Sequence, residues 1–103
     1  MKEGIATLKA KNDRRPLVTI VTAVLNDASG INSTIRSVVS QTYPKIEYLV
    51  IDGGSTDGTL EIIRDNGQVI DHWISEPDDG IYYAFNKAVH LAKGEWIAFM
   101  NSS

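Results

Sequence analysis

The sequence predicts an α/β fold, in which about four strands form one parallel β-sheet and three helices connect them. Three observations support this prediction. Four short apolar segments rich in β-branched residues alternate with segments whose apolar residues recur at helical spacing. The connections between these segments are a few residues long, as in right-handed β-α-β units. Polar and acidic residues follow the predicted strands, at the edge where α/β proteins bind ligands.

The first predicted strand spans Pro16 to Asn26, "PLVTIVTAVLN", and its nearly continuous apolar character suits a strand covered on both faces. Ser29 is expected to cap the helix after this strand, because its hydroxyl can accept a hydrogen bond from a free backbone N–H group. This helix is expected to end at Gln41 to Pro44. Its predicted apolar face consists of Ile31, Ile35, Val38 and Val39.

The second predicted strand, Ile46 to Ile51, leads into a glycine-rich turn, "DGGSTDGT", from Asp52 to Thr59. The glycines allow a tight backbone, and the Ser, Thr and Asp side chains are candidate caps for a short helix through Leu60, Ile62 and Ile63. The turn matches neither of the usual glycine-rich phosphate-binding motifs. It can still bring backbone close to a flat ligand, while Asp52 accepts hydrogen bonds from a ribose or a base.

The third predicted strand spans Val69 to Ser75 and is followed by an acidic loop, Glu76 to Gly80. A helix is expected from Ile81 to Lys93, with Gly94 as a left-handed C-cap. The segment "EWIAFM", residues 95–100, is the fourth predicted strand. The predicted apolar face of the helix consists of Ile81, Phe85, Ala88, Val89 and Ala92.

The composition is that of a single soluble domain, with 43% apolar and 22% charged residues. Because the sequence has no cysteine and no signal-peptide core, disulfide bonds are excluded and a cytoplasmic location is expected, with at most peripheral contact to the inner face of a membrane. Residues 1–15 hold half of the basic residues and are predicted to be a flexible leader. Residues 16–103 form the folded part. They carry five basic and eleven acidic side chains, which argues against nucleic-acid binding.

Ten polar residues gather at the predicted carboxyl edge of the sheet, and two interpretations stay open for each. Any one of them can be a helix cap or a solvated turn residue. Together, several carboxylates on one edge repel each other unless a cation joins them, which favours Mg²⁺ or Mn²⁺ with oxygen ligands, usually bound with phosphates. No Ser-His-Asp set is evident. The ten residues are Asn26, Asp27, Asp52, Ser75, Glu76, Asp78, Asp79, Asn101, Ser102 and Ser103.

The order of three motifs resembles the N-terminal half of family 2 glycosyltransferases, in particular a bacterial polysaccharide-biosynthesis branch. A strand ending in Asn26 is followed by "SVVSQTYPKIEYLVIDGGSTDGT" and then by "SEPDDGIYYAFNKAVHLAKGEWIAFMNSS". The resemblance covers residues 16–103. It implies a GT-A fold with a Rossmann-like nucleotide-binding half, a nucleotide-sugar donor and a cation, Mg²⁺ or Mn²⁺, held by a D-x-D-type motif. It also implies transfer with inversion to the hydroxyl of a saccharide or a lipid-linked saccharide.

By resemblance, Asn101 and Ser103 stand where the family holds its cation, but both are neutral here, which makes a weak cation site. Gly53 replaces a second aspartate that many members carry, so the identity of the nucleotide base stays open. Lys87 is the cation expected to reach the diphosphate. The full set expected around the donor nucleotide is Thr22, Ala23, Asn26, Asp52, Gly53, Ser55, Asp79, Asn86 and Lys87.

Members of this family keep their general base after these motifs, so the chain is expected to be the donor half of a longer domain, truncated within the cation motif and inactive alone. An alternative is a non-catalytic nucleotide-binding or interaction module that pairs through an exposed fourth strand, with another chain or with a second copy of itself. A third, weaker alternative is a flavodoxin-like or receiver-like domain.

Overall fold

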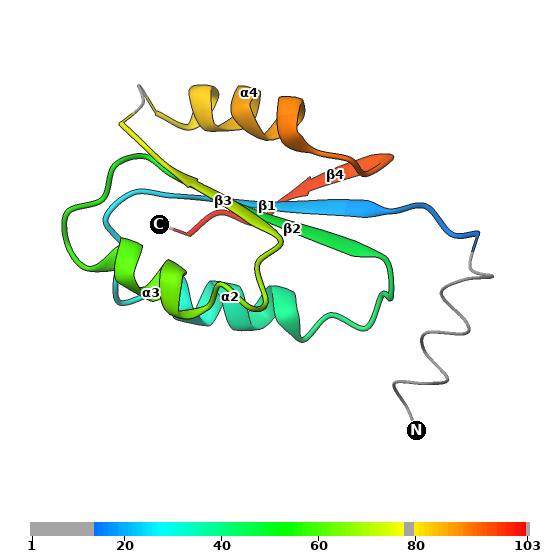
Figure 1. Cartoon of the computed structure of the whole chain (residues 1–103), viewed down its shortest axis with the longest axis horizontal. Helices are drawn as coiled ribbons and strands as arrows, with labels where there is room; N and C mark the ends of the chain where they lie inside the picture. Colours follow the sequence, from blue (N-terminus) through cyan, green and yellow to red (C-terminus); the bar gives the residue numbers. More distant parts are fainter. Residues whose placement is uncertain (1–13, 78–79, 103) are drawn as a thin grey trace.

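The computed structural model describes residues 14–77 and 80–102, without the side chains of Ile81 and Tyr82. It confirms the predicted fold class: a four-stranded parallel sheet whose strands are joined by three helices (Figure 1). The elements are β1 (Val18–Val24), α2 (Ile31–Val39), β2 (Ile46–Asp52), α3 (Thr59–Asp65), β3 (His72–Ser75), α4 (Ile81–Leu91) and β4 (Trp96–Phe99).

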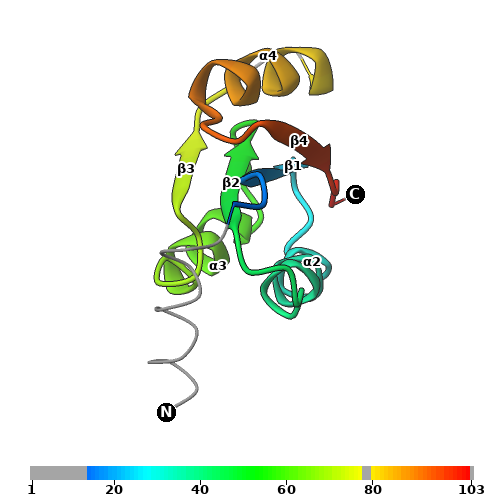
Figure 2. The same ribbon diagram turned by 90° about the vertical axis from the view of Figure 1, so that its right-hand side faces the viewer.

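The strands lie in the order β3-β2-β1-β4, all parallel. Helices α2 and α3 cover one face of the sheet, and α4 covers the other, as two perpendicular views show (Figures 1 and 2). Because the strands are parallel, all their carboxyl ends lie at the same edge. The register there pairs Ser75 with Asp52, Asp52 with Val24, and Val24 with Ser102, which forms an isolated bridge beyond β4.

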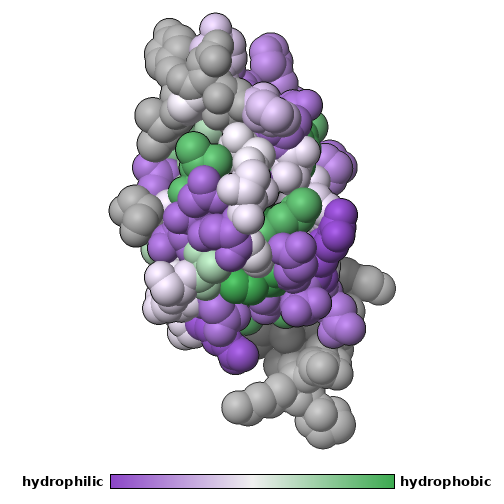
Figure 3. Space-filling model, turned by 90° about the vertical axis from the view of Figure 1, so that its left-hand side faces the viewer, coloured by the Kyte–Doolittle hydropathy of each residue, from purple (hydrophilic) through white to green (hydrophobic). Residues whose placement is uncertain are grey.

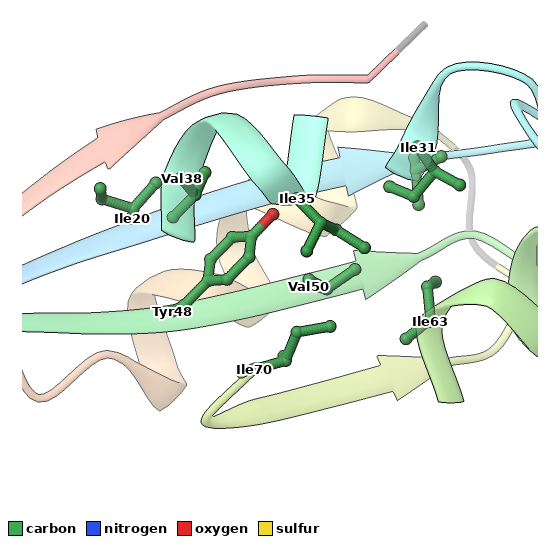
Figure 4. Close-up of a cluster of buried hydrophobic side chains, with 9 residues drawn as sticks. Ile20, Ile31, Ile35, Val38, Tyr48, Val50, Ile63 and Ile70 are labelled. Carbon is green, nitrogen blue, oxygen red and sulfur yellow. The ribbon is translucent and has the colours of Figure 1, made fainter. Parts of the chain in front are cut away.

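Each face of the sheet has its own apolar core. On the α2 and α3 side, Ile31 and Ile35 of α2 and Ile63 of α3 pack against Tyr48 and neighbouring residues of β1 and β2 (Figure 4). Burial raises the pKa of the Tyr48 hydroxyl above its usual value. On the other side, α4 closes a second core, formed by Val21, Ala23, Leu49, Ile51, Ala84 and Ala88.

Helix α4 presents a different face to the sheet from the one that its sequence pattern predicts. Ala84 and Ala88 are buried against β1 and β2, whereas Phe85 and Val89 are exposed. The ring of Phe85 stacks on Phe99 of β4, with 4.6 Å between the ring centroids. Two alanines allow the helix to lie close to the sheet, and the larger side chains are displaced to its flank. The predicted apolar face was therefore wrong for Phe85 and Val89, and it did not include Ala84.

The predicted helix caps were also wrong in part. Helix α2 begins after Gly30, and no side chain, including that of Ser29, caps it. Val39, at its end, is exposed rather than buried. Helix α4 ends at Leu91, before an extended Ala92, and Gly94 is not left-handed. Close contacts with Leu17 and Thr19 require a glycine at position 94 instead.

Strand β4 is the least buried strand of the sheet. All four of its residues are exposed, and Trp96 retains 64% of its accessible surface. Within the described residues β4 pairs with β1 alone, so its other side has no neighbouring strand. None of the helices within residues 14–77 and 80–102 combines the length and apolar character that crossing a membrane requires.

Candidate functional site

The carboxyl edge of the sheet is the candidate site, and it is largely hydrophilic (Figure 3). Two loops dominate this edge: residues 25–30, after β1, and residues 53–58, after β2. We call them the paired loops, because hydrogen bonds join them along their length.

Asn26 begins the pairing, since its backbone N–H donates to the Ser55 hydroxyl at 2.8 Å and its side-chain oxygen accepts from the Thr56 N–H at 2.8 Å. Two further bonds of 3.0 Å run from the Asp27 N–H to the Thr59 hydroxyl and from the Ala28 N–H to the Asp57 carboxylate. Asn26 has a φ of 52°, a left-handed conformation that asparagine tolerates better than most residues. The two loops therefore form one ordered platform.

Asp52, at the end of β2, stabilises this platform. It is fully buried, and its carboxylate accepts hydrogen bonds from the N–H groups of Gly54 (3.2 Å) and Ser55 (2.9 Å) and from the Ser75 hydroxyl (2.8 Å). The Ser55 hydroxyl donates to its other oxygen. The sequence suggested that Asp52 accepts hydrogen bonds from a ligand, but groups of the chain itself donate these bonds. No surface of Asp52 is left for a ribose or a base.

Asp57 orders the second of the paired loops. Its carboxylate accepts hydrogen bonds from the Thr59 hydroxyl at 2.6 Å and the Thr59 N–H at 3.0 Å, so it serves the first turn of α3 although Gly58 is the N-cap. The pKa of the Asp57 carboxyl group is below its usual value. The main cause is the hydrogen bond from the Thr59 side chain, and a second cause is the hydrogen bond from the Ala28 N–H. Asp57 therefore stays ionised while it joins the two loops to α3.

Other expected donor residues also prove to be supporting groups. The Thr22 hydroxyl is buried in a 2.8 Å hydrogen bond with the Tyr48 hydroxyl, and Ala23 is buried under α4. Ser55 is held between Asn26 and Asp52. At these positions the chain can offer backbone rather than side chains to a ligand, and Gly53 is the partly exposed point between the loops.

Three of the expected residues do face outward on α4 and beyond β4. Asn86 and Asn101 are exposed, and Lys87 is partly exposed. The Lys87 ammonium lies 3.2 Å from the carboxylate of Glu76, whose backbone N–H donates to the Asp52 carbonyl at 3.1 Å. The ion pair joins α4 to the end of β3. Asp79 and Ser103, the remaining expected residues, lie outside the described residues.

Asp27 belongs to the site, although the sequence placed it only on the polar rim. Its carboxylate accepts a hydrogen bond from the hydroxyl of Ser102, the middle residue of the motif at the end of β4. The sequence signal that could have identified Asp27 is its place in a polar pair, Asn26 and Asp27, directly after a buried strand. The sequence could not connect it to a residue 75 positions later.

The described residues do not fit a divalent-cation site. Among residues 14–77 and 80–102, no three His, Asp or Glu side chains come together at metal-binding distances. Asn101 contributes a neutral amide where such cations prefer carboxylates. Within this part of the chain, the Mg²⁺ or Mn²⁺ expected from the acidic edge therefore has no site built from three such side chains.

One hollow of the surface lies away from this edge. One of about 500 Å³ lies near the amino ends of the strands, where Glu47, His72 and Lys93 contribute to its wall. Glu47 there accepts hydrogen bonds from the Thr19 hydroxyl (2.7 Å) and the Lys93 N–H (2.8 Å), which fix the turn between α4 and β4. We place the site at the carboxyl edge, because Lys87, Asn101 and the paired loops converge there.

The chain is similar to known proteins in sequence and in fold. Residues 19–102 match the family model described as Glycosyl transferase family 2. An uncharacterized glycosyltransferase of Mycobacterium tuberculosis is 37% identical over 89 residues, which are 85% of this chain and 34% of the relative. A Bacillus subtilis protein assigned to teichuronic acid biosynthesis, the glycosyltransferase TuaG, is 36% identical over 92 residues, or 85% of this chain and 36% of the relative. The chain thus spans about a third of the length of these relatives.

Among solved structures, the mannosyltransferase PcManGT from Pyrobaculum calidifontis, in complex with GDP-Man and Mn²⁺, is similar with a TM-score of 0.78. It is 26% identical in sequence. The similarity covers 97% of this chain and 33% of that chain. The described fold is therefore that of the nucleotide-binding part of a GT-A enzyme.

Proposed function

Because the chain belongs to glycosyl transferase family 2, we propose that it forms the donor-binding part of an inverting glycosyltransferase. The donor is a nucleoside-diphosphate sugar, and the acceptor is a hydroxyl of a saccharide or lipid-linked saccharide in cell-surface polysaccharide synthesis. One observation carries this proposal: at the carboxyl edge hydrogen bonds join the two paired loops, Ser102 is bonded to Asp27, and Lys87 is paired with Glu76, the residue after β3.

In this proposal, the paired loops hold the nucleoside and Lys87 meets the diphosphate. Gly53 has no side chain, so a flat base can lie against the backbone between the loops. The Lys87 ammonium can exchange the Glu76 carboxylate for oxygens of the diphosphate, whose two phosphates together carry two negative charges. Asn86 and Asn101 add exposed amides for polar groups of the donor.

The chemical step that we propose is a single in-line displacement. The acceptor oxygen attacks the anomeric carbon while the bond to the nucleoside diphosphate breaks, which inverts the configuration. Lys87 stabilises the negative charge that develops on the leaving diphosphate. The acceptor proton passes to a general base that, by resemblance, follows the motifs present in this chain. We therefore expect the chain by itself to bind donor without transferring sugar, at the cytoplasmic face where nucleotide sugars are available.

A donor titration tests the proposed function. Calorimetry with UDP, GDP and their sugar conjugates, each with and without Mn²⁺, is expected to show binding of at least one nucleotide. Lys87→Met should weaken nucleoside-diphosphate binding about tenfold, or about 1.4 kcal/mol, because one charge-assisted contact is lost. Binding of the corresponding nucleoside should not change.

Lys93→Met is the matched control, because its exposed side chain lies near the opposite end of the strands. It should leave both affinities unchanged. The titrations with Mn²⁺ show whether this cation binds together with the diphosphate, although the described residues alone form no cluster that holds it. Absence of any nucleotide binding by the unmodified chain would contradict the proposed function.

A second candidate function, an interaction module, is favoured by β4. Its four residues are exposed and its outer side has no neighbouring strand in the described part of the chain, which suits pairing with another strand. Sedimentation velocity should then show a concentration-dependent dimer that Ile97→Lys, on the exposed strand, dissociates. Val69→Lys, an exposed apolar position before β3, is the control. A monomer at all concentrations would exclude self-association.

A further inference from the structure

We propose that Asp27 is a positioning residue that holds the segment beyond β4, and with it Asn101, at the donor edge. This inference rests on the proposed function, because it gives Asp27 a role in binding the donor's diphosphate. Neither the three family motifs nor the expected donor residues include Asp27.

Asp27 joins three segments that are far apart in the sequence. Its backbone oxygen accepts hydrogen bonds from the N–H groups of Gly30 (3.1 Å) and Ile31 (2.9 Å), at the start of α2. Its backbone N–H donates to Thr59, at the start of α3, at 3.0 Å. Its carboxylate receives the Ser102 hydroxyl. The backbone bonds fix where Asp27 lies, so the side chain provides a fixed anchor for Ser102.

Ser102 continues the pairing of β4 with β1 past the end of the strand. Its N–H donates to the Ala23 carbonyl at 3.1 Å, as the Met100 N–H does to Val21 at 2.8 Å. Ser102 is only 6% exposed, whereas Asn101 is exposed. Successive side chains of an extended segment point to opposite sides, so anchoring Ser102 inward sets Asn101 outward. The contact with Asp27 thereby determines which side chain reaches the donor edge.

Gly30 provides independent evidence that the Asp27 carboxylate has a defined place. A Cβ atom at Gly30 would lie 2.5 Å from Oδ2 and 2.9 Å from Oδ1 of Asp27. The φ of Gly30 is −110°, which any residue adopts, so backbone conformation does not require glycine there. The carboxylate itself occupies the space. Gly30→Ala is thus a way to displace the carboxylate without removing it.

The experiment compares four variants and a control with the unmodified chain by calorimetry, using UDP, GDP, uridine and guanosine as probes. Asp27→Ala, Ser102→Ala and Gly30→Ala should each weaken nucleoside-diphosphate binding about tenfold and leave nucleoside binding unchanged. Asp27→Asn should stay within about threefold of the unmodified chain, because its amide oxygen can still accept from Ser102. Ser33→Ala, at an exposed position on α2 outside the paired loops, is the control and should have no effect.

A double-variant cycle and an NMR measurement separate positioning from simple support of the fold. Asp27→Ala combined with Ser102→Ala should weaken diphosphate binding no more than either alone, because both remove one contact. In the ligand-free protein, the backbone amide signal of Asn101 should shift or broaden in Asp27→Ala and Gly30→Ala, but not in Ser33→Ala.

The outcomes are distinguishable. If the unmodified chain binds diphosphate and the Asp27 and Gly30 variants bind it equally well, Asp27 only supports the fold and the inference is wrong, while the proposed function stands. An unchanged Asn101 signal in both variants also overturns the inference. If the unmodified chain binds no nucleoside diphosphate, the proposed function fails and this inference fails with it.

Discussion

Replacing Asp52 with alanine is expected to lower the free energy of unfolding by roughly 3 to 5 kcal/mol, because a buried carboxylate that accepts four hydrogen bonds is removed. The donors of Gly54, Ser55 and Ser75 would lose their common acceptor. A domain of this size has only about 5 to 15 kcal/mol of stability, so much of it would be lost. Urea denaturation followed by tryptophan fluorescence measures the change.

Asp52→Asn keeps the shape of the side chain but removes its charge. The amide oxygen can replace the oxygen that accepts three of the four bonds, and the amide group can turn toward Ser55, so a loss of about 1 to 2 kcal/mol is expected. Asp65→Ala, at the exposed end of α3, is the control and should stay within about 0.5 kcal/mol.

The same pair of variants tests whether Asp52 contacts the donor. Because Asp52 is buried and its acceptor sites are filled by the chain, folded Asp52→Asn should bind nucleotides with nearly unchanged affinity. If Asp52→Asn keeps its stability but loses nucleotide binding, the carboxylate contacts the ligand directly, and its role is not confined to supporting the loops.

Gly94→Ala is expected to destabilise the chain by about 3 kcal/mol, which is at the upper end for an added methyl group in a packed site. The new Cβ atom would lie 2.5 Å from the Thr19 hydroxyl oxygen, 2.7 Å from the Thr19 nitrogen and 2.9 Å from the Leu17 carbonyl oxygen. Two of these atoms are backbone atoms of or beside β1, the strand between β2 and β4, so they cannot move without disturbing the sheet.

Gly67→Ala is the matched control for this prediction. Gly67 also has an ordinary φ, and the nearest atom to its added Cβ, the Arg64 carbonyl oxygen, is 3.2 Å away. Its change in stability should stay below about 1 kcal/mol. Equal effects of the two substitutions would show that the contact with β1 does not determine the requirement for Gly94.

The elements that the sequence predicted well are those whose evidence is local. Runs such as Val18–Val24 and Ile46–Asp52 are apolar and β-branched over most of their length, so one segment is enough to identify a buried strand. The helix from Ile31 was predicted from the spacing of its own apolar residues. Boundaries and caps were less accurate, because the chain after α4 depends on contacts of Ala92 and Gly94 with residues of or beside the sheet.

The sequence predicted which residues lie at the carboxyl edge but not the contacts of their side chains. The sequence located Asp52, Ser55 and Thr22 at or near the carboxyl edge, yet their side chains are used within the chain. The partners of these side chains include Ser75 and Tyr48, which are 23 and 26 positions away. A sequence pattern does not show which distant polar groups contact each other. A side chain that stabilises the fold and one that contacts a ligand therefore look the same in the sequence.

By itself, then, the sequence determined the order and type of the elements, the parallel sheet and the polar carboxyl edge, because each follows from the periodicity or composition of a short segment. The tertiary structure alone decided which polar groups are buried and which face outward. The carboxylate of Asp52 is hydrogen-bonded within its own loop, and that of Asp27 accepts the hydroxyl of Ser102. Ala84, rather than Phe85, packs on the sheet. The physical reason is that burial and hydrogen-bond satisfaction are properties of pairs of segments, which exist only once the chain has folded.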